Sequence, residues 1–248
     1  YMLFQYDLSL NDLTVGIESG ELSNELYLYR GIAKSNMYDF AEALNDINIF
    51  LVRENKDYDK LFEVYVQRAI IFYNLNLYND ALKDLNMAIE LNPSSGAAYM
   101  HRANISSIFE NYDESLNDLN MALELGENDR ELYLLRGLIN IKLNKYGAAH
   151  DDLTFFLINT PDKHKDKINA LLNRGIANFY LNNPDKAKND LNKVIMMDEE
   201  NWLAYRYRGE ILKEKGDITK AISDLTKARN SGEPDPIIYL LRGELNIE

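Results

Sequence analysis

The strongest constraint on the fold is a dipeptide of arginine and a small residue that recurs along the whole sequence. The arginines follow one another at steps of 38, 34, 34, 38, 34 and 34 residues. The seven copies are Arg30-Gly31, Arg68-Ala69, Arg102-Ala103, Arg136-Gly137, Arg174-Gly175, Arg208-Gly209 and Arg242-Gly243. A period of this length indicates stacked copies of one supersecondary unit, each of which contacts only its neighbours.

A series of aspartates is aligned with the arginines. Each is followed by Leu or Ile, and all but the first lie sixteen residues after the arginine of their unit. The series is Asp12, Asp46, Asp84, Asp118, Asp152, Asp190 and Asp224. We predict a ladder of partly buried ion pairs that sets the register of paired helices, in which breaking one pair costs roughly 3–5 kcal/mol. The alternative is an arginine row that receives acidic ligands.

Each unit is predicted to form two helices joined by a short polar turn. The first helix carries Tyr-x-x-Arg-Gly/Ala, as in residues 65–69. The second carries Ala-Leu-x-Asp-Leu-Asn-x-Ala, as in residues 81–88, where apolar residues recur at i, i+1, i+4 and i+7. That spacing forms one stripe of a 3.6-residue period, and no strand-like alternation is sustained. The pattern predicts an all-α chain.

These motifs resemble the tetratricopeptide repeat family over essentially the whole chain. The aromatic position of the family holds Tyr27, Tyr65, Tyr99, Tyr133, Tyr205 and Tyr239, with Leu171 as the exception, and the later alanine position holds Ala43, Ala81, Ala149, Ala187 and Ala221, with Ser115 as the variant. Arginine replaces the usual leucine before the glycine, and only Pro93 supplies the closing proline. The resemblance implies a right-handed superhelical solenoid of antiparallel helix-turn-helix repeats.

The repeat boundaries predict one array over residues 1–248. Residues 1–20 match a second helix that lacks its first, and residues 236–248 match a first helix that lacks its second. The six complete repeats are predicted at 24–61, 62–95, 96–129, 130–167, 168–201 and 202–235. An orphan helix would expose its apolar stripe, so we expect the chain to be part of a longer array.

Three repeats together form a larger unit of 106 residues. The pairs Gly20-Glu21, Gly126-Glu127 and Gly232-Glu233 follow this spacing, as do Phe50 and Phe156. The extra four residues of each cassette fall at 53–60 and 161–167. Either similar binding surfaces recur along the array, or the duplication left tolerated loop insertions.

Composition limits the classes of partner. The net charge of −13 disfavours nucleic acid and anionic lipid, which bind cationic surfaces, so the pentatricopeptide-like RNA-reader interpretation is disfavoured. The chain has no cysteine, no apolar run of about 18–20 residues and no basic segment followed by an apolar one near residue 1. We therefore expect no membrane insertion and a cytoplasmic location.

No arrangement of residues predicts catalysis, a metal site or a cofactor. His101, His150 and His164 are not spaced as metal ligands and are interpreted as isolated surface or boundary residues. The glycines are dispersed, so no phosphate-binding loop is present. The many tyrosines mostly occupy the packing position of the first helix and are expected in the core.

The resemblance places partner binding on the first helices, at positions that flank the arginine. The candidate groove residues are Leu28, Ile32, Val66, Ile70, Tyr73, Met100, Asn104, Leu134, Leu138, Ile141, Leu172, Ile176, Phe179, Arg206, Glu210 and Lys213. Most are apolar, which suits an inserted helix or extended segment. The same side chains could instead pack between helices of a tight superhelix, and the sequence leaves both interpretations open.

The predicted function is a non-catalytic scaffold or adaptor that binds peptide or helical segments of partner proteins in a concave groove. The alternative is a recruiting region of a larger enzyme whose catalytic domain lies outside this chain. Self-association through the exposed half-repeats is a further expectation.

Overall fold

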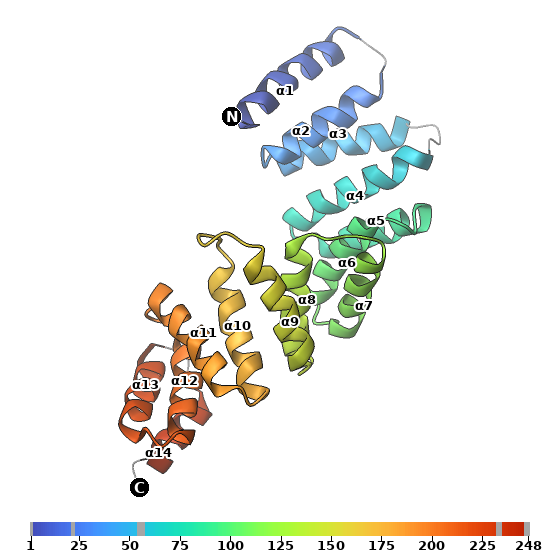
Figure 1. Ribbon diagram of the computed structural model, residues 1–248. Coiled ribbons are helices and arrows are strands. Elements are labelled where there is room, and N and C mark those ends of the chain that lie inside the picture. The colour runs from blue at the N-terminus through green and yellow to red at the C-terminus, as the bar shows by residue number, and fades with distance from the viewer. Residues whose placement is uncertain (1, 21–22, 54–57, 232–234, 246–248) are drawn as a thin grey trace. The chain divides into compact units, whose positions relative to one another are not determined.

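The computed structural model describes residues 2–20, 23–53, 58–231 and 235–245, and the side chains of 2–8 and 58–60 are not described. Fourteen α-helices and no strand occur within the described ranges (Figure 1). Their bounds are α1 Met2–Glu18, α2 Glu25–Asn36, α3 Phe40–Arg53, α4 Tyr58–Asn74, α5 Tyr78–Leu91, α6 Gly96–Ile108, α7 Tyr112–Glu124, α8 Arg130–Lys142, α9 Tyr146–Ile158, α10 Lys167–Tyr180, α11 Pro184–Met197, α12 Trp202–Glu214, α13 Ile218–Ser231 and α14 Pro236–Leu245. The predicted features at Glu21, 54–57 and Gly232-Glu233 lie outside the described residues.

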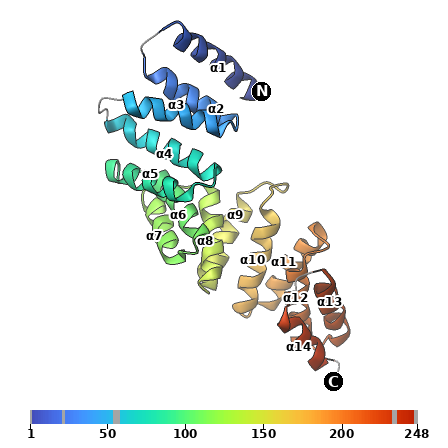
Figure 2. The ribbon, with the colours of Figure 1, turned by 180° about the vertical axis from the view of Figure 1, so that it is seen from behind.

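The chain divides into two compact units, residues 1–127 with α1–α7 and residues 128–248 with α8–α14. Within each unit, every helix packs against the next helix along the chain. First helices also contact the first helix of the following hairpin, as α2, α4 and α6 do in the first unit and α8, α10, α12 and α14 do in the second (Figures 1 and 2). The predicted all-α helical-repeat fold is confirmed, while the boundaries of a single array stay a prediction.

The small residue after each arginine sits where the two helices of a hairpin approach most closely. A Cβ atom added at Gly137 would lie 2.8 Å from Cγ of Leu153, and one at Gly209 would lie 2.9 Å from Cγ of Leu225. These leucines directly follow the ladder aspartates and are fully buried. The spacing of sixteen residues therefore places a small residue of the first helix against a branched side chain of the second helix.

A left-handed residue ends the first helix of every complete hairpin, eight residues after the ladder arginine. It has a φ between +57° and +77° in all six turns and is Tyr38, Asn76, Glu110, Asn144, Asn182 or Gly216. The next backbone N–H donates to a carbonyl five residues earlier, as Leu77 does to Phe72 at 2.8 Å. This hydrogen bond closes the helix in the Schellman manner, which reverses the chain within three residues.

No helix of the described residues is both long enough and apolar enough to cross a membrane.

Candidate partner-binding face

Six arginine–aspartate pairs join the two helices of the six complete hairpins, and we call them the Arg–Asp ladder. In each pair Nε and Nη2 of the arginine donate to the two carboxylate oxygens of the aspartate sixteen residues later, at 2.6–2.9 Å. The pairs are Arg30–Asp46, Arg68–Asp84, Arg102–Asp118, Arg136–Asp152, Arg174–Asp190 and Arg208–Asp224. The aspartates are buried and the arginines are partly covered, so the predicted ladder is confirmed.

In four hairpins, the third guanidinium nitrogen of the ladder arginine donates to a residue of the preceding hairpin. Nη1 of Arg68 donates to Asn48 at 2.8 Å, and Nη1 of Arg208 donates to Asn192 at 2.7 Å. Arg102 and Arg174 make the same contact with Asn86 and Thr154, respectively. The acceptor always lies two residues after the preceding ladder aspartate. These arginines are therefore engaged on all three nitrogens inside their own unit, which disfavours the alternative of a row open to acidic ligands.

Two cavities lie between the first helices of residues 1–127. The α2–α4 cavity has a volume of about 330 Å³ and is lined by Leu28, Tyr29, Ile32, Phe62, Glu63, Val64, Val66, Gln67, Ser95 and Ala97. The α4–α6 cavity has a volume of about 240 Å³ and is lined by Ala69, Ile70, Tyr73, Asn74, Leu85, His101, Asn104 and Ile105. Six of the seven candidate groove residues of this unit line one cavity or the other. Met100, the seventh, is half-buried on α6 and lines neither.

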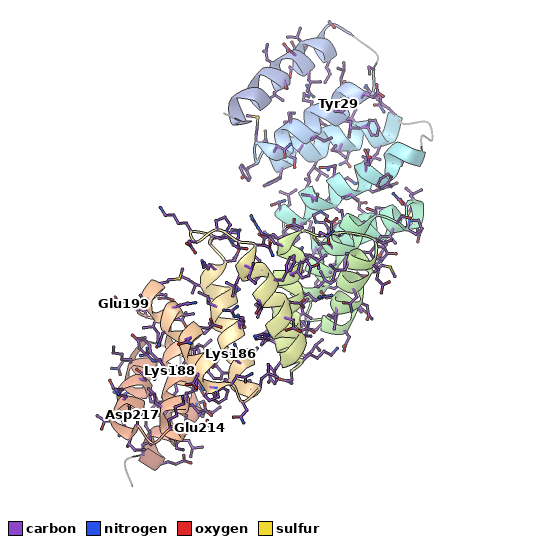
Figure 3. The ribbon with its side chains drawn as sticks, viewed as in Figure 1. Tyr29, Lys186, Lys188, Glu199, Glu214 and Asp217 are labelled. Atoms are coloured by element: carbon purple, nitrogen blue, oxygen red, sulfur yellow. The ribbon has the colours of Figure 1, made fainter. Side chains whose placement is uncertain are left out.

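One stripe of α4 joins the two cavities. Glu63 and Val66 line the first, and Ile70 and Tyr73 line the second. These positions are spaced by three, four and three residues, so they lie along one side of the helix. We call this stripe, with its two flanking cavities, the α4 face. Tyr29 of α2 stands at its edge with 57% of its surface exposed (Figure 3).

In residues 128–248 the candidate groove residues are largely used in packing. Leu134 is buried, and Leu138 packs beside it against the cluster around Phe156. Ile176 is likewise buried, and Leu172 and Phe179 pack against its cluster. Ile141 is half-buried. Leu28 and Val66 of the first unit are buried to about the same extent as Leu134, in core clusters of their own.

The last candidate triad forms ion pairs within its own unit. Arg206 is 7% exposed, lies over the ring of Tyr207 at 4.3 Å, and has carboxylate oxygens of Asp235 and Glu210 at 3.4 and 3.6 Å. Burial raises the pKa of Glu210, and Arg206 offsets only part of that rise. Lys213 forms an ion pair with Glu244 of α14. All three candidates therefore form ion pairs within the second unit.

Charge is distributed unevenly between the two units. Residues 1–127 contain 21 Asp and Glu but only 8 Lys and Arg, whereas residues 128–248 contain 19 of each. The whole net charge of −13 therefore belongs to the first unit, where it creates a negative potential that attracts cationic groups. In the second unit, both lysines and acidic residues lie around α11 and α12, as Lys186, Lys188, Glu199, Glu214 and Asp217 show (Figure 3).

His164 differs from the expectation of isolated residues by contacting a distant helix, whereas His150 contacts its sequence neighbour Asp151 at 3.1 Å. His164 lies in the loop before α10, and its Nε2 is 3.3 Å from a carboxylate oxygen of Glu131 on α8. Its Nδ1 accepts a hydrogen bond from the backbone N–H of Asp166 at 3.3 Å, which leaves the proton on Nε2 to face Glu131. Folding of the loop onto α8 brings these residues together, and no regular spacing in the sequence indicates it.

Comparisons with known proteins agree with the fold. Tetratricopeptide repeat models match residues 62–95 and 172–236, and no curated protein sequence matches the chain. YrrB, a TPR protein with an unusual peptide-binding site, has a similar structure, with a TM-score of 0.64 and 22% identity over 76% of this chain and 98% of its own. The C-terminal part of a TPR repeat-containing protein from Cytophaga hutchinsonii has a TM-score of 0.67 and 14% identity, over 96% of this chain and 94% of its own. A chain of the APC/C hetero-tetramer Cut9–Hcn1 has a TM-score of 0.65 and 15% identity, over 98% of this chain and 46% of its own. At these identities the likeness shows the fold.

Proposed function

Because the chain is a tetratricopeptide repeat protein, we propose that it is a non-catalytic scaffold that binds peptide or helical segments of partner proteins along its first helices. Such repeats imply a protein–protein interaction scaffold. The finer claim is that the α4 face receives the partner segment. A recruiting role beside a catalytic domain outside this chain, a cytoplasmic location and self-association stay predictions.

The observation that carries this proposal is the pair of cavities on one side of α4. Their walls are mostly apolar, as in Val66 and Ile70, and polar groups stand at the rim, as in Glu63 and Asn104. Cavities of this kind take the anchor side chains that supply most of the binding energy in protein interfaces. The structure of YrrB, with its peptide-binding site, supports a peptide-binding role for a fold of this kind.

For the candidate residues of the second unit, we propose a structural role in place of direct contact with the partner. Leu134, Leu138, Leu172, Ile176 and Phe179 pack in the core clusters of α8 to α10. Arg206, Glu210 and Lys213 form ion pairs within the second unit, and Ile141 is half-buried. We therefore propose direct partner contact at Leu28, Ile32, Val66, Ile70, Tyr73 and Asn104, with Met100 beside them.

Site-specific cross-linking tests the proposal. A photo-reactive phenylalanine derivative at position 73 should capture partner proteins, and Ile70→Asp should abolish that capture while helicity by circular dichroism is retained. The matched position is Tyr239, which is 51% exposed on α14 of the other unit. Equal capture from positions 73 and 239, or capture that Ile70→Asp leaves unchanged, would reject the α4 face.

A further inference from the structure

We propose that the occupant of the α4 face is a cationic segment with two apolar anchors about 10 Å apart, one in each cavity. The inference rests on the proposed function, because it assumes that a partner segment lies on this face, and it adds the chemistry of that segment.

The anchor spacing follows from the stripe on α4. Val66 lines the α2–α4 cavity and Tyr73 lines the α4–α6 cavity, and these residues are seven positions apart on one helix. At a rise of 1.5 Å per residue, the two sites are separated by about 10 Å along the helix axis. A helical partner spans that distance with residues i and i+7, and an extended partner spans it with i and i+3 at about 3.3 Å per residue.

The cationic character follows from the electrostatics of the first unit. Every described cation on α2, α4 and α6 is already paired with a buried aspartate: Arg30 and Lys34 with Asp46, Arg68 with Asp84, and Arg102 with Asp118. Glu63, in contrast, is exposed at the cavity rim and makes no ion pair among the described residues. The face thus adds one exposed carboxylate, that of Glu63, to a unit that holds 21 acidic and 8 basic residues.

The remaining titratable group of the cavities does not offset this charge. His101 lines the α4–α6 cavity, and burial lowers the pKa of its imidazole, so the ring is neutral at pH 7. Lysine or arginine beside each anchor would meet Glu63 and the negative potential of the unit, whereas a carboxylate there would be repelled.

Binding of labelled peptides to the full chain tests the proposal by fluorescence anisotropy. The first peptide carries leucine at i, i+3 and i+7 among lysines, which supplies both anchor spacings. The second replaces every lysine by glutamate, and the third replaces every leucine by serine. We expect the lysine–leucine peptide to bind at least about tenfold more tightly than either other peptide, with an affinity that falls as salt rises.

Matched variants place the peptide on the protein. Tyr73→Ala, Tyr29→Ala and Glu63→Lys should each weaken binding of the lysine–leucine peptide by about fivefold or more. Tyr29 is exposed, so its truncation leaves the core intact if Tyr73→Ala disturbs folding. Tyr239→Ala and Glu199→Lys, exposed positions of the other unit, should stay within about twofold.

The outcomes separate the two proposals. If the glutamate–leucine peptide binds equally well and Tyr73→Ala weakens both peptides, the cationic inference is overturned while the α4 face stands. If the lysine–leucine peptide binds but none of the three variants weakens it, both proposals fail at this face. No binding of the lysine–leucine peptide at about 1 mM, a free energy near −4 kcal/mol, overturns the inference.

Discussion

In residues 1–127, the positions that flank the ladder arginine pack in core clusters and also line two cavities, whereas in residues 128–248 the equivalent positions pack in clusters or form ion pairs. Val66 and Arg206 show the contrast. Both stand two residues before a ladder arginine, yet Val66 borders the α2–α4 cavity, and Arg206 is enclosed by Tyr207, Glu210 and Asp235. The ladder itself is the same in both units. The same Arg–Asp ladder therefore supports two different surfaces, because the ladder arginines and the candidate groove residues lie on different sides of the first helix.

The largest loss of stability is expected from changes in the Arg–Asp ladder, which both units share. Asp84→Ala in the first unit and Asp190→Ala in the second should each destabilise their own hairpin by about 3 kcal/mol, because each strands an arginine that is mostly covered. Hydrogen exchange resolved by segment measures both losses separately. A large loss of stability in one unit and none in the other would contradict an equivalent role of the Arg–Asp ladder in both units.

A smaller loss is expected where glycine separates the two helices. Gly137→Val should cost about 2 kcal/mol, because its Cβ atom would lie 2.8 Å from Leu153 and force the helices apart. The control is Gly243→Val, since an added Cβ there meets nothing within 4 Å. Thermal unfolding followed by circular dichroism compares the two, and an equal cost would show that helix spacing is not the cause. Ala69 and Ala103 occupy this position in two hairpins of the first unit, which already accommodate a Cβ, whereas the α2–α3 hairpin has Gly31.

The filled face of the second unit should be more sensitive than the open one. Arg206→Met keeps the stem that packs on Tyr207 but removes the cation between Glu210 and Asp235, so we expect a loss of about 1–2 kcal/mol. Protonation of Glu210, whose pKa burial already raises, limits the cost. Tyr29→Ala on the open face should change stability by less than about 0.5 kcal/mol. Denaturant titration measures the free energy of unfolding of both variants. A larger loss for Tyr29→Ala than for Arg206→Met would contradict the comparison.

A gain in stability is expected at the turns of the first unit. Tyr38 and Glu110 adopt φ values of 65° and 60°, where side chains other than Asn, Asp and Gly are disfavoured. Glu110→Gly should stabilise the α6–α7 hairpin by about 0.5–1 kcal/mol. Asn144→Gly at the equivalent turn of the second unit should have a smaller effect, because asparagine already tolerates this conformation. Matched melting curves would show the difference, and a loss at Glu110→Gly would reject the assignment of strain.

The smallest effect is expected from pH. Because burial lowers the pKa of His101 from its ordinary value of 6.5, the unfolded chain binds a proton first as pH falls. The first unit should therefore keep full stability above pH 6.5 and lose some of it as pH decreases below that value. Hydrogen exchange of α6 at pH 7.5 and 5.5 measures the loss, which His101→Gln should reduce. An unchanged difference in the variant would assign the pH dependence to other groups.

Part of this molecule was predictable from sequence spacing. The offset of sixteen residues predicted that Arg68 meets Asp84, because a helical hairpin with a short turn brings those positions together. The contact of Arg68 with Asn48 was missed, although the recurrent asparagine two residues after the aspartate was a signal for it. The left-handed residue at Tyr38 and Glu110 had no compositional signal, since neither residue favours that conformation. The loop contact of His164 with Glu131 likewise depends on how one insertion folds.

The sequence alone determined the repeat, the two helices of each unit and the Arg–Asp ladder, because helical periodicity and loop length are local properties that recur seven times. The division into two units, which assigns the net acidic charge to residues 1–127, came from the structure. Only the tertiary structure placed six of the candidate groove residues beside the two cavities. That placement depends on the side chains that neighbouring helices supply, because Asp235 forms an ion pair with Arg206, whereas Val66 lines the α2–α4 cavity.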